Sequence, residues 1–252
     1  MSDRVIVEIA DGIAHVRLNR PDKRNALDGE MFRAIADAGE QLKATGELRA
    51  VVLSGTGKSF CAGLDLAMFG RLDNAADSGN PGAMQPSGLT HLGQQVAWVW
   101  QELPVPVIAA VHGHALGGGL QIALGADIRI AHPDTQLSVR EVHWGLVPDM
   151  TGTFILSKLV RQDVAKELTF TARIIDGREA AALGLVTRLS ADPVAEASAL
   201  AAEIATRSHE AVGAAKRLFN RLAGEGAAEQ FDAERREIAT IIERGLGGVS
   251  RP

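Results

Sequence analysis

Residues 104–153 decide the fold and read PVPVIAAVHGHALGGGLQIALGADIRIAHPDTQLSVREVHWGLVPDMTGT. The apolar run 107–111 predicts a buried strand, and residues 120–124 can form a helix. Between them lie Gly113 and the glycine triplet 117–119. A strand that leads through glycines into a helix leaves backbone N–H groups without intrahelical partners, and glycine lets a ligand atom approach them. Such a turn suits developing negative charge, although a tight turn that needs glycine only for packing gives the same pattern.

A second turn of this kind lies upstream. Residues 49–55 form another apolar strand, and the short stretch FCAGLDL follows at 60–66. Two strand-to-turn connections could each supply one N–H to a single oxygen, which is how an oxyanion hole is built. Losing one such donor typically costs about 2.7–4 kcal/mol of transition-state stabilisation. The two turns together predict a site that stabilises an oxyanion.

Length and composition narrow the class of protein. The chain has 252 residues, 46% of them apolar and 23% charged, which is enough for a substantial core. A net charge of -5, no tyrosine and 4% aromatic residues argue against a nucleic-acid-binding surface. The single cysteine, Cys61, excludes an internal disulfide framework. Because there is no apolar signal region and no run of about 18 apolar residues, we expect a soluble, cytoplasmic protein that does not bind membranes.

The order of the predicted elements indicates an α/β fold. Two strands within residues 5–18 are separated by Asp11-Gly12, a strong hairpin signal. Asp28 is a plausible N-cap for the helix that follows. Residues 71–90 have no periodicity, so we expect a long loop that is either a cover near a site or disordered. Beyond residue 153 the pattern becomes helical.

Two further motifs, typical of phosphate binding and of metal binding, are incomplete in this sequence. Residues 54–59, SGTGKS, look like the end of a phosphate-binding loop, but Val52 stands where that motif needs its first glycine. We therefore expect a glycine-rich hairpin tip there. His112 and His114 could place two metal ligands on one strand face, but no third ligand is near in sequence. Structural histidines are favoured, and no metal site is predicted.

Glu141 and Asp149 are the candidate acid/base groups. Glu141 is expected on or at the end of a strand, and Asp149 follows it by eight residues, just before a helix. This spacing does not show that the two side chains converge. Asp149 could instead be the N-cap of the helix at Thr153, and Glu141 could pair with Arg140.

Taken together, these segments resemble the crotonase (enoyl-CoA hydratase/isomerase) superfamily over nearly the whole chain. The order of the motifs is more specific than any one glycine cluster. They are Asn19-Arg20-Pro21 with Asn25-Ala26-Leu27, FCAGLDL at 60–66, GHALGGG at 113–119, ADIRIA at 126–131, the stretch 141–148, and RIID at 173–176 before LGLV at 183–186. The resemblance implies a spiral of repeated ββα units over residues 1–190, which holds the acyl-CoA site. It also implies a helical C-terminal region, residues 191–252, through which the chain assembles as a homotrimer or homohexamer.

The same resemblance implies a coenzyme A thioester as the substrate and no metal or redox cofactor. The oxyanion donors would be the backbone N–H groups of Leu64 and Gly118, which hold the thioester oxygen as it becomes an enolate. A nearby carboxylate could then move an α- or γ-proton. Trp144 could wall the acyl pocket or belong to the core. The residues expected to bind the substrate are Arg24, Ala26, Ala62, Asp65, Leu66, Gly117 and Trp144.

Gln121 stands where hydratases of this family carry a glutamate, and a glutamine amide has no proton to exchange near pH 7. Glu141 matches the second carboxylate of the hydratases. Asp149 matches a spacing found in the dienoyl-CoA isomerases of the superfamily, although these also carry an aspartate at the position of Gln121. The hypothesis is a cofactor-free double-bond isomerase of an enoyl- or dienoyl-CoA. Glu141 and Asp149 would be its acid/base pair, and Gln121 would position groups by hydrogen bonding.

Two alternatives stay open. The first is a hydratase in which Glu141 works alone on a water molecule held by Gln121. The second is an acyl-CoA-binding protein that keeps the groove but has lost efficient catalysis, which the glutamine at 121 would permit.

Overall fold

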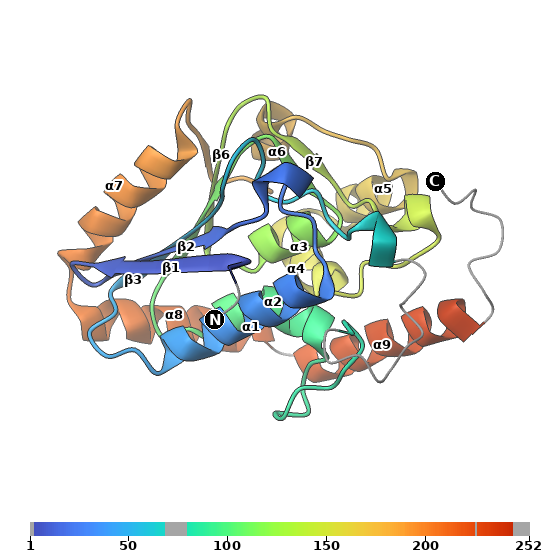
Figure 1. The fold of residues 1–252 in the computed structure, drawn as a ribbon, viewed down its shortest axis with the longest axis horizontal. Helices are drawn as coiled ribbons and strands as arrows, with labels where there is room; N and C mark the ends of the chain where they lie inside the picture. Colours follow the sequence, from blue (N-terminus) through green and yellow to red (C-terminus); the bar gives the residue numbers. More distant parts are fainter. Residues whose placement is uncertain (1–2, 69–79, 225, 244–252) are drawn as a thin grey trace.

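The computed structural model describes residues 3–68, 80–224 and 226–243 (Figure 1). The main sheet has the strand order β1-β2-β3-β4-β6-β8, and β5 and β7 form a second, smaller sheet. β1 and β2 form the hairpin predicted around Asp11-Gly12, and all later neighbours in the main sheet are parallel. The strands are β1 Val5–Ala10, β2 Ile13–Leu18, β3 Ala50–Gly55, β4 Val107–Val111, β5 His114–Leu116, β6 Ile128–Ala131, β7 Gln136–Ser138 and β8 Arg188–Leu189.

The helices cover the sheets and continue to the end of the described chain. The α-helices are α1 Gly29–Lys43, α2 Leu92–Glu102, α3 Gly118–Leu124, α4 Gly152–Leu159, α5 Gln162–Thr171, α6 Gly177–Leu183, α7 Pro193–Ala205, α8 His209–Gly224 and α9 Ala227–Glu243. Short 3-10 helices lie at η1 Pro21–Lys23, η2 Leu66–Met68 and η3 Glu141–Trp144. Asp28 is the N-cap of α1, as predicted, because its carboxylate accepts from the N–H of Met31 at 2.8 Å. Among the described residues, none of these helices is long and apolar enough to cross a membrane.

The central strands are buried on both faces, so their side chains alternate between two cores. Val51 and Leu53 of β3 belong to the large core that α1, α2 and α3 share. Ala50 and Val52 belong to a smaller core, to which α7 contributes Ala201. This explains why β3 and β4 are nearly continuous apolar runs rather than alternating ones.

The elements repeat as two strands followed by a helix. The units β1-β2-α1 and β4-β5-α3 are complete, and β6-β7 leads through η3 to α4. After β3, Cys61 forms an isolated parallel bridge with Ala115 of β5, in the place of a second strand. In the first unit both strands, β1 and β2, belong to the main sheet. In the later units the first strands, β4 and β6, extend the main sheet and the second strands, β5 and β7, form the smaller one, in agreement with the expected spiral of ββα units.

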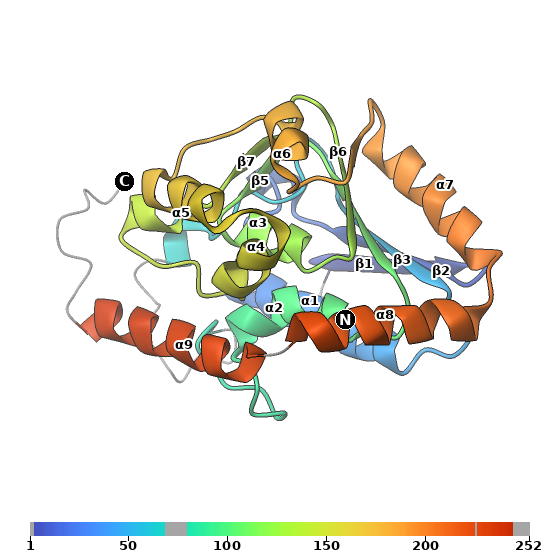
Figure 2. The same cartoon turned by 180° about the vertical axis from the view of Figure 1, so that it is seen from behind.

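The last helices lie along one side of the molecule. Seen from behind, α8 and α9 follow one another along the lower edge, and α7 lies at the far end from α9 (Figure 2). Phe231 anchors α9, because its fully buried ring packs edge-on against Trp98 of α2 at 4.9 Å and Phe154 of α4 at 5.5 Å between centroids. α9 is therefore packed against the core near the N-terminus of α4.

Two local expectations were wrong. The loop at 54–59 is not a hairpin tip, because β3 runs parallel to both of its neighbours. Glu141 is neither on a strand nor at the end of one, because β7 ends at Ser138 and Glu141 begins η3. Residues 71–79 of the long loop predicted at 71–90 lie outside the described residues, and its described part, from residue 80, has no helix or strand before α2.

Candidate active site

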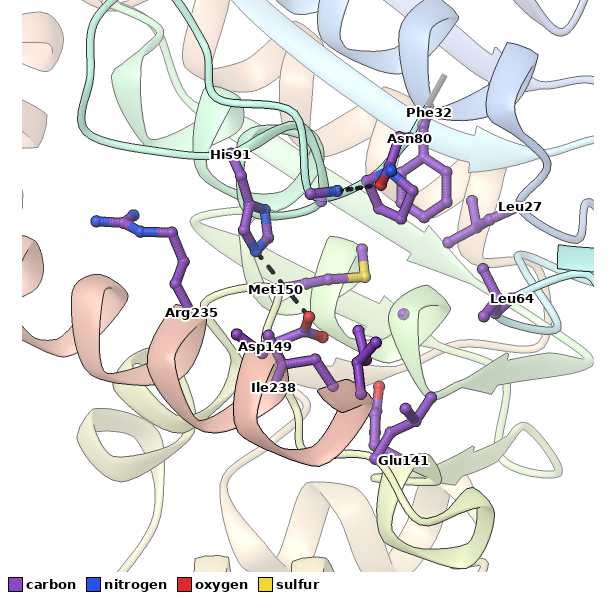
Figure 3. A pocket seen from close by; sticks show the side chains of 17 residues that line it. Leu27, Phe32, Leu64, Asn80, His91, Glu141, Asp149, Met150, Arg235 and Ile238 are labelled. Atoms are coloured by element: carbon purple, nitrogen blue, oxygen red, sulfur yellow. Dashed lines mark hydrogen bonds and ion pairs between the residues drawn. The ribbon is translucent and has the colours of Figure 1, made fainter. Parts of the chain in front are cut away.

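A pocket of about 240 Å³ lies where both glycine turns, η3 and α9 meet (Figure 3). Its walls are mostly apolar, and two carboxylic acids, Glu141 and Asp149, face into it. The lining residues are Leu27, Phe32, Leu64, Asn80, Pro81, Gly82, His91, Gly93, Gly118, Glu141, Leu146, Asp149, Met150, Arg235, Ile238, Ala239 and Ile242. Four predicted site residues, Leu64, Gly118, Glu141 and Asp149, are thus brought to one cavity.

The turn at residues 60–66, which carries Leu64, is held in place by the loop before α1. Leu27 forms a bridge with Leu64, donating its N–H to Gly63 and accepting from Asp65. Asn25 is fully buried, and its side-chain amide donates to backbone carbonyls of the 56–60 loop, including Phe60 at 3.1 Å. These contacts fix the backbone around Leu64 without using its own N–H.

The turn at residues 113–119, which carries Gly118, depends on glycine at two positions. Gly117 has φ +51°, and a Cβ there would lie 3.2 Å from Oε1 of Glu141. A Cβ on Gly119 would lie 2.3 Å from the carbonyl oxygen of Cys61, so this glycine lets the two turns pack backbone against backbone. Gly118, between them, begins α3.

The N–H groups of Leu64 and Gly118 are available to a ligand. Neither donates to an acceptor within residues 3–68, 80–224 and 226–243. Both residues line the same pocket, and the N–H of Gly118 also lies at the positive end of α3. The arrangement matches what an oxyanion site requires, namely two backbone donors from separate loops at one cavity.

Glu141 is held by Gln121, which lies on α3. The Gln121 Nε2 donates to Glu141 Oε1 at 2.5 Å, and the Gln121 Oε1 accepts from the N–H groups of Met150 and Gly152, both at 2.9 Å. The other oxygen of Glu141, Oε2, is buried and has no hydrogen-bond partner among the described residues. Burial raises the pKa of Glu141 to about 7, although the hydrogen bond from Gln121 opposes this shift.

Asp149 lies on the loop between η3 and α4. Its side chain is 25% exposed, and its Oδ2 lies 4.0 Å from the Nε2 of His91. Burial, with the negative charges of Glu141 and Glu234, raises the pKa of Asp149 to about 7. Two acids in one apolar pocket, each with a pKa near neutrality, can exchange protons with a bound molecule at physiological pH.

The two structural alternatives for these acids, Asp149 as a helix N-cap and Glu141 as the ion-pair partner of Arg140, are wrong. Thr151, rather than Asp149, is the N-cap of α4. Arg140 donates to the carbonyl of Ala172 at 3.0 Å, and Glu141 bonds to Gln121 instead. The two acids converge because the chain turns back through η3 and Gly145, which has φ +71°.

The histidine pair 112 and 114 has structural contacts. His112 Nε2 lies 3.0 Å from the carbonyl oxygen of Gly57, and His114 Nδ1 lies 2.8 Å from Ser59 Oγ. Cys61 is buried, and burial raises the pKa of its thiol to about 12, so it is a packing residue and not a nucleophile.

The residues expected to bind the substrate do not line this pocket. The backbones of two stretches lie together beside it, since the N–H of Ala62 donates to the carbonyl of Arg24 at 2.9 Å. Asp65 pairs with Arg20 at 2.6 Å. Trp144 packs edge-on against the ring of His143. The predicted residues absent from the lining are Arg24, Ala26, Ala62, Asp65, Leu66, Gly117 and Trp144.

Sequence reasoning missed His91 and the contribution of α9. Glu234 is buried and accepts from Gln94 Nε2 at 3.1 Å and from the N–H of Thr151 at 3.0 Å, which fixes α9 against the loop that carries Asp149. Ile238 and Ile242 then face the pocket. The pattern beyond residue 153 predicted helices, but nothing in the sequence said which part of the molecule the last of them covers.

Comparison with known proteins agrees with this architecture. The model of the enoyl-CoA hydratase/isomerase family matches residues 8–244. The mouse mitochondrial Delta(3,5)-Delta(2,4)-dienoyl-CoA isomerase is 36% identical over 222 residues, or 81% of this chain. The aligned part is 64% of that relative's length, so the chain spans slightly under two thirds of it. The chain belongs to the enoyl-CoA hydratase/isomerase family.

Solved structures agree as well. An enoyl-CoA hydratase/isomerase from Xanthobacter autotrophicus Py2 has a TM-score of 0.83 at 28% identity, covering 100% of this chain and 90% of that one. A carnitinyl-CoA dehydratase from Mycobacterium avium 104 has a TM-score of 0.83 at 29% identity, covering 96% and 93%. The expected crotonase fold with a helical C-terminal region is thereby confirmed.

Proposed function

We propose that the chain is an enzyme that shifts a carbon–carbon double bond in an enoyl- or dienoyl-CoA. The N–H groups of Leu64 and Gly118 bind the thioester oxygen. One of the two acids, Glu141 or Asp149, takes a proton from the substrate to give an enolate, and the other returns a proton to a different carbon. Gln121 holds Glu141 in place and takes no proton.

One observation carries this proposal. Two carboxyl groups with pKa values of about 7 face the same apolar cavity as two backbone N–H groups that have no acceptor among the described residues. Because the two like charges repel, the pair favours one ionised and one protonated acid near neutral pH. A proton shift needs one group of each kind at the start of the reaction. The name of the mouse relative, a dienoyl-CoA isomerase, agrees with this chemistry.

Hydration of a 2-enoyl-CoA is the second candidate. It is favoured by the Oε2 of Glu141, which has no hydrogen-bond partner in the described part of the chain and could accept a proton from a water molecule. It is disfavoured by Gln121, because Gln121 Oε1 already accepts from two backbone N–H groups and one of the two N–H groups of Nε2 is bound to Glu141. Gln121 can therefore offer a water molecule one N–H donor and no acceptor.

Asp149→Asn tests the proposal, because an amide keeps the shape of the carboxyl group but exchanges no proton. Wild type and variant are assayed by absorbance on a 3-enoyl-CoA, a 3,5-dienoyl-CoA and a 2-enoyl-CoA, and binding is measured by calorimetry. We expect isomerisation to fall at least 100-fold with binding within about threefold, in the range typical for an acid/base residue. Unchanged isomerisation, or hydration as the main activity of the wild type, would refute the isomerase assignment. Binding of several acyl-CoAs without turnover by the wild type would instead favour a binding protein.

The coenzyme A groove and the assembly stay predictions. We propose that Arg24 and Ala26, beside Ala62, contact the coenzyme A part of the substrate. We also propose that residues 191–252 carry the contacts of a homotrimer or homohexamer. Light scattering of the purified chain tests the second point, and a monomer would contradict it.

A further inference from the structure

His91 is a buried histidine whose ring reaches the pocket, and the mechanism above does not use it. It lies directly before α2 and is the N-cap of that helix. Its ring is buried, with 5% of the side chain exposed, and it lines the same cavity as the two acids. Figure 3 shows the ring of His91 and the carboxyl of Asp149 facing one another.

The capping contact fixes which ring nitrogen carries the proton. Nδ1 of His91 accepts from the N–H of Gln94 at 2.9 Å, and the Gln94 side chain closes a capping box by accepting from the N–H of His91. A ring nitrogen that accepts a hydrogen bond carries no proton, so the neutral ring must have its proton on Nε2. Nε2 is the atom that lies 4.0 Å from Oδ2 of Asp149.

The surroundings keep this ring neutral. Burial, aided by the positive charge of Arg235, lowers the pKa of His91 to about 4. Arg235 donates to the carbonyl of Leu89 at 2.9 Å and to Gln94 Oε1 at 3.0 Å, so it is held on the α2 side of the ring. His91 is therefore a neutral N–H donor throughout the range in which the acids titrate.

We propose that His91 is a positioning residue of the double-bond shift, in which its Nε2–H donates a hydrogen bond to the carboxylate of Asp149 in the reacting complex. The inference rests on the proposed function. The present separation is longer than a hydrogen bond, and such contacts commonly tighten when substrate binds. The other charged groups that act on this pair are Glu141 from η3 and Glu234 from α9, which disfavour the ionised Asp149, and Arg235. His91 is thus the neutral donor that favours the ionised form.

His91→Asn removes the proposed Nε2–H donor and keeps the N-cap of α2, so it distinguishes the two roles of His91. Asparagine is among the best N-cap residues, so it keeps the bond to Gln94, but its short side chain leaves no donor at the position of Nε2. We expect unchanged thermal stability, a fall of about tenfold in kcat with KM within about twofold, and a rise of about one pH unit in the pKa of Asp149. The pKa is read from the carboxyl carbon by NMR titration of the protein saturated with butanoyl-CoA, a saturated acyl-CoA that has no double bond to shift, because the contact is proposed for the occupied site. A pKa of Asp149 unchanged in this variant would overturn the proposal, since a purely structural role would alter stability instead.

A double-mutant cycle checks that His91 acts through Asp149. Adding His91→Asn to Asp149→Asn should lower the residual rate by less than twofold, and a further tenfold loss would overturn the proposal. ¹⁵N NMR of the wild-type ring gives a readout independent of activity, and a proton on Nδ1 would also overturn it. Failure of the proposed function is distinct, because it appears as full turnover in Asp149→Asn alone.

Discussion

The side-chain amide of Gln121 joins Glu141 to the loop of Asp149. Its Nε2 lies 2.5 Å from Oε1 of Glu141, and its oxygen accepts from the N–H groups of Met150 and Gly152. Because those two donors require an oxygen, the NH₂ group must face Glu141. The amide therefore orients one acid and fixes the backbone beside the other.

Gln121→Glu should convert this contact into a pair of acids. The new carboxylate keeps the bonds to Met150 and Gly152, but its second oxygen meets Oε1 of Glu141, so the two must share a proton. We expect isomerisation at pH 7 to fall at least tenfold, and hydration of a 2-enoyl-CoA to rise above the wild-type level, because two carboxyl groups would then flank the site. Both rates are measured by absorbance. Gln121→Met, which has no acid, is the control, and equal hydration by the two variants would contradict the prediction.

Asp149→Asn should stabilise the free protein at high pH. The folded-state pKa of Asp149 is about 7, against an ordinary value of 3.8. Between these values the folded protein binds a proton that the unfolded chain does not, so stability falls as pH rises through this window, and the full penalty is present above pH of about 7. We expect a gain of about 1–3 kcal/mol at pH 8 and none below pH of about 4, measured by urea unfolding.

Asp134→Asn is the matched control for that measurement. The exposed Asp134 pairs with Arg178 at 2.7 Å, which lowers its pKa, so its removal should give no gain at pH 8. An Asp149→Asn protein less stable than wild type at pH 8 would show that the carboxylate is stabilised in the folded state.

Glu234→Ala should loosen α9 from the pocket. Its carboxylate accepts from Gln94, from the N–H of Thr151 and from Thr153 Oγ1 at 2.5 Å, and all three donors would lose this partner. Because Ile242 of the same helix lines the cavity, we expect a loss of about 2 kcal/mol or more of stability and an increase in KM larger than the decrease in kcat.

Hydrogen exchange of α9 is the direct measurement for this variant, and its amides should exchange faster than in the wild type. Glu237→Ala, an exposed position on the same helix, should leave exchange and KM unchanged. Equal exchange in the two variants would mean that the buried carboxylate does not hold the helix.

Gly117→Ala should impair the site more than the fold. The backbone there has φ +51°, which disfavours residues with a Cβ by about 1–3 kcal/mol, and the new methyl would press on Glu141 at 3.2 Å. We expect kcat/KM to fall at least tenfold. Gly46→Ala is the control, because nothing lies within 4 Å of a Cβ at that position. Full activity in Gly117→Ala would mean that the turn adapts without moving Glu141.

Local sequence patterns were sufficient to predict several secondary-structure elements and the two turns that carry the backbone N–H donors of the site. The apolar runs at β3 and β4, the hairpin at Asp11-Gly12 and the cap at Asp28 depend on neighbours in the chain, so periodicity and turn chemistry were sufficient. The turns that carry Leu64 and Gly118 could be predicted for the same reason, because each follows an apolar strand in the chain. The resemblance in turn indicated that both N–H groups face one pocket.

Tertiary structure alone decided how the acids are tuned and what closes the cavity. Glu141 meets Gln121 from α3, Asp149 faces His91 from before α2, and Glu234 reaches Thr151 across 83 positions of the chain. Such pairs leave no periodic signal, because each side chain by itself is an ordinary polar residue whose burial and charged neighbours appear only when distant segments pack. The raised pKa values arise from that burial and those charges, and so they are properties of the folded chain and not of the sequence pattern.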